Sequence, residues 1–247
     1  MDQRLKDKRV LVTGGSRGIG AAIVKRLASE GAHVALTYSG SPGRAAAVVK
    51  AAQAFGVKSL AIQANSADAG VLVVAVDRTV KELGGIDILV NNAGIAVMAP
   101  VEDFKLEDFD RIFAINVRAV FVAVQAAVRH MKEGGRIINI GSTNAERMPF
   151  AGGAVYAMSK SALQGLVKGL ARDLGPRGIT INNVQPGPVD TEMNPATGEF
   201  AESLKKLMAL PRYGTVEEIA GMVAYLASPE AGYITGASLM IDGGFSA

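Results

Sequence analysis

The sequence predicts an α/β protein with one doubly wound parallel β-sheet of about seven strands and helices on both faces. Short apolar runs rich in β-branched residues, such as residues 9–13 (RVLVT) and 136–140 (RIINI), recur along the 247 residues and are typical of buried strands. Helical segments separate these runs, and such alternation favours parallel strands joined by helical crossovers. No Pro/Gly/Ser-rich linker, change of composition or internal repeat interrupts the pattern, so residues 1–247 are predicted to form a single domain.

The individual elements follow from local patterns along the chain. Each predicted strand is a short apolar run bounded by turn residues; the runs are residues 9–13, 33–38, 58–64, 85–90, 136–140, 178–184 and 238–241. Apolar residues at helical spacing predict helices that end near residue 30 or cover residues 45–55, 69–83, 106–131, 154–174 and 217–226. The segment at about 188–212 mixes polar, glycine and apolar residues and is predicted to be a mobile lid over a substrate.

The composition excludes several classes of function. The 26 Lys and Arg residues are scattered among 23 acids, so no nucleic-acid surface is expected. The chain has no cysteine, which excludes disulfides, thiolate metal ligands and cysteine nucleophiles, and no metal site is expected. The first residues carry no apolar signal, and the longest apolar run, residues 71–76, is too short to cross a bilayer. We therefore expect a cytoplasmic protein without a membrane partner.

A glycine-rich loop joins the first strand to the first helix. Its glycines have the spacing Gly-x-x-x-Gly-x-Gly, at Gly14, Gly18 and Gly20. Glycine allows backbone N–H groups to approach a pyrophosphate, and a helix N-terminus adds partial positive charge. A tight structural turn would explain the glycines alone, but the strand before them and the helix after them favour a nucleotide site of the Rossmann type.

The end of the second strand bears on the choice of cofactor. An acidic residue at this position would bind the ribose hydroxyls of NAD. The 2′-phosphate of NADP instead requires that no acidic residue stands here and that a cation lies nearby. The strand ends instead at Tyr38 and Ser39, with Arg17 in the glycine loop and Arg44 soon after. The sequence therefore favours NADP(H) over NAD.

Tyr156 and Lys160 are four positions apart on a predicted helix, so both project from one face. A cation held there is expected to lower the tyrosine pKa from its usual value of about 10, which would prepare the phenol to give a proton to a developing alkoxide. Most Tyr–Lys pairs of this spacing lie on a protein surface and have no function. The catalytic interpretation of this pair depends on the predicted nucleotide site upstream. Asn92 and Asn116 likewise have structural interpretations, as a turn residue and a helix-packing amide.

Several motifs follow one another along almost the whole chain: Thr13-Gly14-x-x-x-Gly18-x-Gly20, Asn91-Asn92-Ala93-Gly94, Asn116, Ser142, Tyr156-x-x-x-Lys160, and Pro186-Gly187 followed by Thr191. With these motifs in this order and at these distances, the sequence resembles the short-chain dehydrogenases/reductases of about 250 residues. The general pattern is similar to 3-oxoacyl-carrier-protein reductases and carbonyl reductases. Residues 141–149 and 185–191 resemble a narrower subgroup that includes bacterial biofilm-dispersal reductases, which are linked to cyclic-di-GMP binding.

The resemblance implies a role for each of four residues. Tyr156 would give a proton to the substrate oxygen, and Lys160 would lower the tyrosine pKa and bind the nicotinamide ribose. Ser142 would hold the substrate carbonyl, and Asn116 would keep a water that relays protons. The implied cofactor contacts are Gly14, Ser16, Arg17, Gly18, Ile19, Gly20, Tyr38, Ser39, Asn65, Ser66, Asn92, Ala93, Gly94, Tyr156, Lys160, Pro186, Gly187, Val189 and Thr191.

Two positions depart from the family pattern. The family serine commonly lies thirteen residues before the tyrosine, which would select Thr143, but we favour Ser142 because Gly-Ser directly after the strand is the usual local pattern. Asn65 stands where many relatives have an aspartate that touches adenine, and we expect an altered adenine contact there.

The expected function is that of an NADPH-dependent reductase that transfers hydride to a ketone or aldehyde. The alternative is a nucleotide-binding regulatory protein on the same fold, with a ligand of the cyclic-di-GMP type. Asn144, Arg147, Phe150, Met193 and Met208 allow several pocket shapes, so the sequence does not name the substrate. Broad apolar faces at residues 112–131 and 154–174, with the small apolar end at 238–247, favour a homotetramer or dimer like those of relatives.

Overall fold

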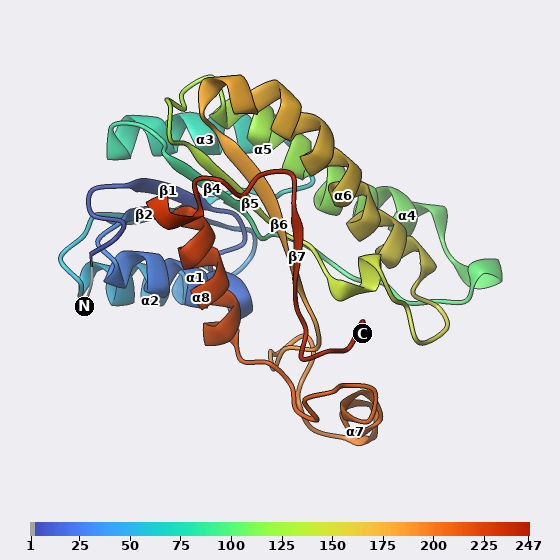
Figure 1. Cartoon of the computed structure of the whole chain (residues 1–247). Coiled ribbons are helices and arrows are strands. Elements are labelled where there is room, and N and C mark those ends of the chain that lie inside the picture. Colours follow the sequence, from blue (N-terminus) through green and yellow to red (C-terminus); the bar gives the residue numbers. More distant parts are fainter. Residues whose placement is uncertain (1–2) are drawn as a thin grey trace.

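Seven parallel strands form the centre of the molecule, in the order β3-β2-β1-β4-β5-β6-β7 (Figure 1). The computed structural model describes residues 3–247, so the first two residues of the amino-terminal stretch lie outside the described part. The strands are β1 (Arg9–Val12), β2 (His33–Tyr38), β3 (Ser59–Gln63), β4 (Ile88–Asn91), β5 (Arg136–Ile140), β6 (Thr180–Pro186) and β7 (Ser238–Ile241). The order runs outward in both directions from β1 and β4, and the predicted doubly wound sheet is confirmed.

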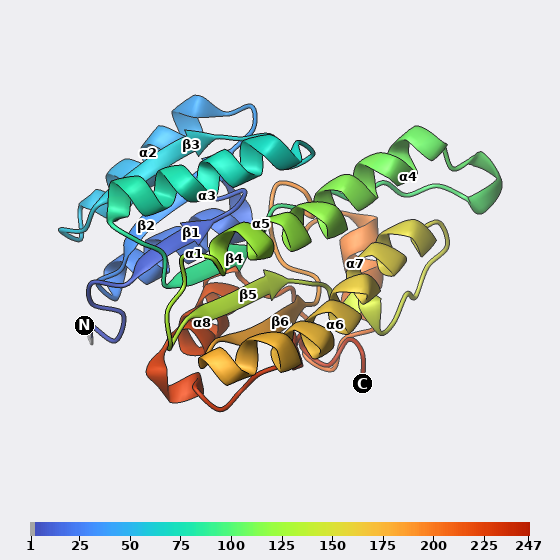
Figure 2. The same ribbon diagram turned by 90° about the horizontal axis from the view of Figure 1, so that it is seen from above.

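Helices cover both faces of the sheet. They are α1 (Gly18–Ser29), α2 (Pro42–Gln53), α3 (Ala69–Leu83), α4 (Leu106–Phe113), α5 (Ala119–Ala127), α6 (Ala154–Leu174), α7 (Glu199–Lys205) and α8 (Val216–Ala227). Figure 1 shows α3, α5 and α6 above the sheet and α1, α2 and α8 on its lower side, and Figure 2 looks down on the face that α3, α5 and α6 cover. Within residues 3–247, no helix is both long and apolar enough to cross a bilayer.

Alternate residues of each strand supply the two layers of the core. Val10 and Val12 of β1 pack with α1 and α8, whereas Leu11 between them packs with α3 and α5 on the opposite face. This division follows from the two-residue period of a strand. It explains why the strands read as continuous apolar runs in the sequence.

The helix predicted over residues 106–131 is helical without a break as far as Ala127, four residues short of the predicted end. It consists of α4, a π-helical turn (Ala114–Arg118) and α5. Asn116 lies in the π-helical turn and bonds the backbone of Ile95, a contact that apolar spacing cannot reveal. Single π-helical turns inside α-helices are frequent at functional sites. The helix α2 also begins three residues before the predicted start at 45, because proline is favourable in a first turn.

A row of buried amides crosses four neighbouring strands. Asn91 Nδ2 donates to Asn139 Oδ1 (2.9 Å), Asn139 Nδ2 to Asn183 Oδ1 (3.0 Å), and Asn183 Nδ2 to Ser238 Oγ (3.1 Å). These residues are also register partners in the sheet. Because a buried amide must be hydrogen-bonded, this polar row specifies the alignment of β4, β5, β6 and β7.

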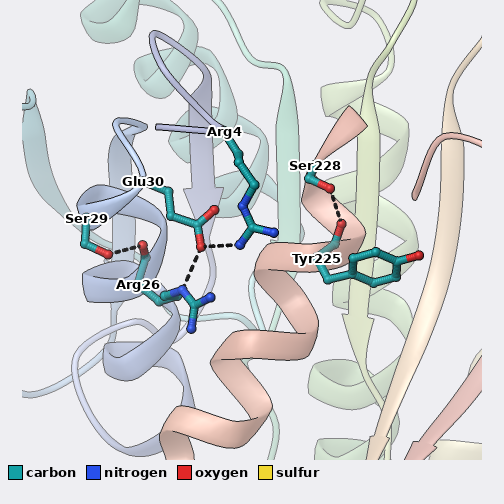
Figure 3. Close-up of polar contacts among 6 residues, drawn as sticks. All are labelled: Arg4, Arg26, Ser29, Glu30, Tyr225 and Ser228. Carbon is teal, nitrogen blue, oxygen red and sulfur yellow. Dashed lines mark hydrogen bonds and ion pairs between the residues drawn. The ribbon is translucent and has the colours of Figure 1, made fainter. Parts of the chain in front are cut away.

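A buried acid at the end of α1 holds the amino-terminal stretch. Glu30 Oε1 accepts hydrogen bonds from Arg4 Nη2 (2.9 Å) and Arg26 Nε (2.7 Å), as Figure 3 shows. Glu30 is almost fully buried, and two guanidinium groups compensate its charge. The bond from Arg4 ties the chain before β1 to the end of α1, whereas the bond from Arg26 lies within the last turn of α1.

Candidate active site

A cavity of about 680 Å³ follows the carboxyl ends of the strands. Its wall is formed by the glycine loop, by the ends of β2 to β6, by the start of α6 and by the segment after β6. Of the predicted site residues, those that line it are Gly14, Ser16, Arg17, Gly18, Ile19, Gly20, Tyr38, Ser39, Asn65, Ser66, Asn92, Ala93, Gly94, Ser142, Tyr156, Lys160, Pro186, Gly187, Val189 and Thr191. Asn116 lies behind this wall.

The glycine loop is closed by hydrogen bonds from the end of β4. Asn92 Nδ2 donates to the carbonyl oxygens of Thr13 (2.9 Å) and Gly14 (3.0 Å), and Thr13 Oγ1 accepts from the backbone N–H groups of Asn92 and Ala93. A Cβ atom at Gly20 would collide with Gly14 O and Asn92 Nδ2. Glycine is therefore required at residue 20 for this close packing.

The start of α1 suits an anionic group. The helix begins at Gly18, Arg17 makes no side-chain cap, and the first turn contains no acid. The first N–H groups of a helix lack partners within the helix, and the helix dipole favours negative charge at this end. The residues present thus fit the pyrophosphate of a dinucleotide, as the sequence predicts.

The adenosine side of the cavity has a feature that the sequence analysis missed. Arg17 and Arg44, the predicted partners of a 2′-phosphate, both face Glu192 from the segment after β6. Arg44 Nη1 lies 2.5 Å and Arg17 Nη1 lies 3.9 Å from Glu192 Oε2. Residues 44 and 192 are 148 positions apart, so no local pattern could have found this contact.

Lys160 is buried at the inner end of the cavity. Its Nζ donates to the carbonyl oxygen of Ile140 (2.9 Å), and burial lowers its pKa to about 8. The ammonium lies 5.9 Å from the centroid of the Tyr156 ring. The predicted placement of both residues on one face of α6 is confirmed.

The predicted pKa shift of Tyr156 has the wrong direction in this structure. Burial raises the pKa of the phenol, and its hydrogen bond with Ser142 opposes that rise without reversing it. Removal from water penalises the phenolate. The ammonium of Lys160 instead hydrogen-bonds the carbonyl of Ile140.

Ser142 and Thr143 have different surroundings. Ser142 lines the cavity beside Tyr156 and accepts a hydrogen bond from the backbone N–H of Asn144 (3.1 Å). Thr143 is buried, and its Oγ1 donates to Asp242 Oδ2 (3.0 Å) near the carboxyl end. Ser142 is therefore the hydroxyl that stands next to the phenol.

Asn116 is fully hydrogen-bonded within the protein. Its Oδ1 accepts from Ile95 N (2.9 Å), and its Nδ2 donates to Ile95 O (2.9 Å) and to Ser159 Oγ (3.0 Å). A Cβ atom placed on Gly94 would lie 3.4 Å from both Asn116 Oδ1 and Lys160 Nζ. Asn116 thus supports the wall of the cavity next to Lys160.

The predicted lid at 188–212 contains α7 and packs on the end of the chain. Ala201, Leu204 and Met208 form a small apolar cluster with Tyr213 and Phe245. Of the five residues expected to shape a substrate pocket, Met193 alone lines the cavity. Arg147 instead donates to the carbonyl oxygen of Phe245 (2.6 Å), which fastens the carboxyl end beneath this segment.

The fold and the cavity define a dinucleotide-binding α/β protein with a Ser–Tyr–Lys group at one end of the site. Residues 14–246 match the family model described as enoyl-(acyl carrier protein) reductase. A short-chain dehydrogenase/reductase from Serratia marcescens BCRC 10948 is 68% identical, with a TM-score of 0.97, and the match covers 98% of this chain and 99% of that one. The chain belongs to the short-chain dehydrogenase/reductase family, and it is an oxidoreductase of that family by class.

Two further relatives have names that state what those proteins bind. A short-chain dehydrogenase from Burkholderia cenocepacia J2315, solved in complex with NADP, is 55% identical with a TM-score of 0.98, over 99% of this chain and 100% of that one. The cyclic-di-GMP-binding biofilm dispersal mediator protein of Escherichia coli (strain K12) is 53% identical, over 97% of this chain and 98% of that protein.

Proposed function

We propose that this protein is an NADPH-dependent carbonyl reductase that converts a ketone or aldehyde to an alcohol. The observation that carries the proposal is the position of Ser142, Tyr156 and Lys160 at one end of a cavity whose other parts fit a dinucleotide. The Burkholderia relative was solved with NADP, and Tyr38 stands where an NAD enzyme would have an acid. A 3-oxoacyl thioester is one candidate carbonyl compound, because a 3-oxoacyl-[acyl-carrier-protein] reductase of Staphylococcus aureus (strain Mu50 / ATCC 700699) is 42% identical over 96% of this chain.

The proposed chemistry divides between cofactor and protein. NADPH supplies the hydride. Ser142 donates a hydrogen bond to the carbonyl oxygen, and Tyr156 gives its phenolic proton to the same oxygen as negative charge develops there. The raised pKa of Tyr156 keeps the phenol protonated before the reaction.

Lys160 and Asn116 complete the proposed catalytic group. With a pKa of about 8, Lys160 is mostly protonated at neutral pH, so its charge favours the phenolate that remains after proton transfer. Asn116 bonds the backbone of Ile95 and the hydroxyl of Ser159, the residue before Lys160. A water held beside these groups would relay a proton from solvent to replace the one that Tyr156 gives up.

Substitution of Tyr156 by phenylalanine tests the proton-donor role. The variant loses the hydroxyl and keeps the ring, so NADPH affinity should stay within a few-fold of wild type while reduction is abolished. The measurements are NADPH oxidation with a panel of ketones and aldehydes, and NADPH binding by fluorescence titration. Residual turnover above about one tenth of the wild-type value would contradict the role.

A second candidate function is a regulatory protein that binds a cyclic dinucleotide. The Escherichia coli relative is named for cyclic-di-GMP binding, and this supports the alternative. The two functions differ in turnover: a sensor would show a ligand-induced thermal shift with cyclic-di-GMP and no NADPH oxidation with any carbonyl compound. A full Ser142, Tyr156 and Lys160 group favours the reductase, because a sensor would not need it.

The proposed assembly is a homotetramer or a dimer in the cytoplasm. The surface beside α4 and α5 exposes Val101, Leu106 and Phe121, and β7 ends the sheet with one free edge. Exposed apolar side chains grouped on one surface are typical of an interface. We propose no nucleic-acid or membrane partner.

A further inference from the structure

Glu192 is the only acidic residue among the described residues that line the cavity. It follows Thr191, a predicted cofactor contact, and its carboxylate reaches across the opening to Arg17 in the glycine loop and Arg44 in α2. The positive groups predicted to bind a 2′-phosphate are therefore already paired with an anion that the protein supplies.

This pair is weak enough to exchange. The side chains of Arg44 and Glu192 are 51% and 60% exposed, and exposed ion pairs contribute little because water screens them. A phosphate brings more charge and more acceptor oxygens than a carboxylate, so it forms stronger bonds with guanidinium groups. A 2′-phosphate would thus displace Glu192 from the arginines, and the carboxylate would oppose it by competition and by repulsion.

We propose that Glu192 is a specificity-determining residue that occupies Arg17 and Arg44 until a 2′-phosphate replaces it. Glu192 then limits affinity for NADP(H) and leaves affinity for NAD(H) almost unchanged, because NAD(H) has no group that needs these arginines. The proposal rests on the cofactor class of the proposed function, and it does not depend on catalysis.

The contact also involves the segment predicted to be a lid. Thr191 and Asn194 pair as an isolated antiparallel bridge, and Val189 bridges to Gly214, so Glu192 lies in a short turn that leads into the segment with α7. Its bond to Arg44 joins this turn to α2 on the other side of the cavity. Displacement of Glu192 would free the turn at the moment when the 2′-phosphate binds.

The test is calorimetric binding of two probes that differ only in the 2′-phosphate, adenosine 2′,5′-bisphosphate and adenosine 5′-monophosphate. We expect Glu192→Gln to tighten binding of the bisphosphate about twofold to fivefold, the upper part of the range that one exposed ion pair gives. Affinity for the monophosphate should change less than twofold. Glu199→Gln is the matched control, because it removes the same charge from the same segment at an exposed site without a pairing to either arginine.

Arg44→Ala gives the second arm of the experiment. If Glu192 acts through this arginine, the gain from Glu192→Gln should shrink in the Arg44→Ala background, which a double-mutant cycle measures. Equal effects on both probes, weaker binding of the bisphosphate, or the same gain from Glu199→Gln would each overturn the proposal. If wild type binds both probes equally, the proposed preference for NADP(H) is wrong. If wild type prefers the bisphosphate but Glu192→Gln has no selective effect, only the role of Glu192 is wrong.

Discussion

Ser142 and Thr143 are neighbouring hydroxyl residues whose partners differ, and this difference predicts their effects on activity. Ser142 stands beside the Tyr156 phenol, whereas Thr143 bonds Asp242 away from the cavity. We expect Ser142→Ala to lower kcat/KM about a hundredfold, the typical loss for one donor to a developing oxyanion. Thr143→Ala should lower thermal stability and leave kcat/KM within a few-fold. The reverse order in steady-state kinetics would assign the carbonyl-binding role to Thr143.

Some residues of the candidate site follow from the sequence, whereas others depend on contacts between distant parts of the chain. Tyr156, Lys160 and the glycine loop could be predicted, because each belongs to a local pattern with a chemical meaning. Glu192 could not, because its partner Arg44 is 148 positions away. The direction of the Tyr156 pKa shift was wrong for a related reason: burial and the bond from Lys160 to Ile140 arise only from tertiary packing.

At the scale of elements, strands were predicted to within about three residues, because buried parallel strands keep continuous apolar runs. The row of amides across the sheet was not predicted, although its members are visible in the sequence as polar residues inside such runs. Asn139 and Asn183 interrupt β5 and β6 at paired positions. A buried polar residue in an apolar strand is a sign that a neighbouring strand supplies its partner.

Asn139→Ala should destabilise the protein more than a surface substitution. The change leaves Asn91 Nδ2 and Asn183 Oδ1 without partners in the core, and each unpaired group costs about 1–3 kcal/mol. Chemical denaturation measures the loss. Because Asn139 and Asn183 share one row, their alanine substitutions should be less than additive in a double-mutant cycle. A loss below about 1 kcal/mol for Asn139→Ala would mean that the row contributes little to stability.

For the whole molecule, apolar side chains remain exposed on the outer face of α5 and beside α4. The helix α5 (AVFVAVQAA) has Gln125 as its single polar residue, and a helix that is apolar on all sides is typically buried. Its inner face packs on α3 and the sheet, whereas Phe121 on the outer face is 45% exposed. Leu106 at the start of α4 and Val101 just before α4 are also exposed. We propose a second copy of the chain as the partner that covers this surface, since homo-oligomers bury the same patch on both subunits.

The assembly can be tested with two matched phenylalanines. Phe121 on α5 and Phe55 just after α2 are similarly exposed, at 45% and 46%. The helix α2, which ends two residues before Phe55, lies on the opposite side of the sheet from α5 (Figure 1). We expect wild type to have the mass of a tetramer or dimer by light scattering at micromolar concentration. Phe121→Glu should lower that mass, because a charge buried at a subunit interface is left unpaired, whereas Phe55→Glu should leave it unchanged. A monomeric wild type would rule out the assembly, and dissociation by Phe55→Glu with none by Phe121→Glu would move the interface to the α2 side.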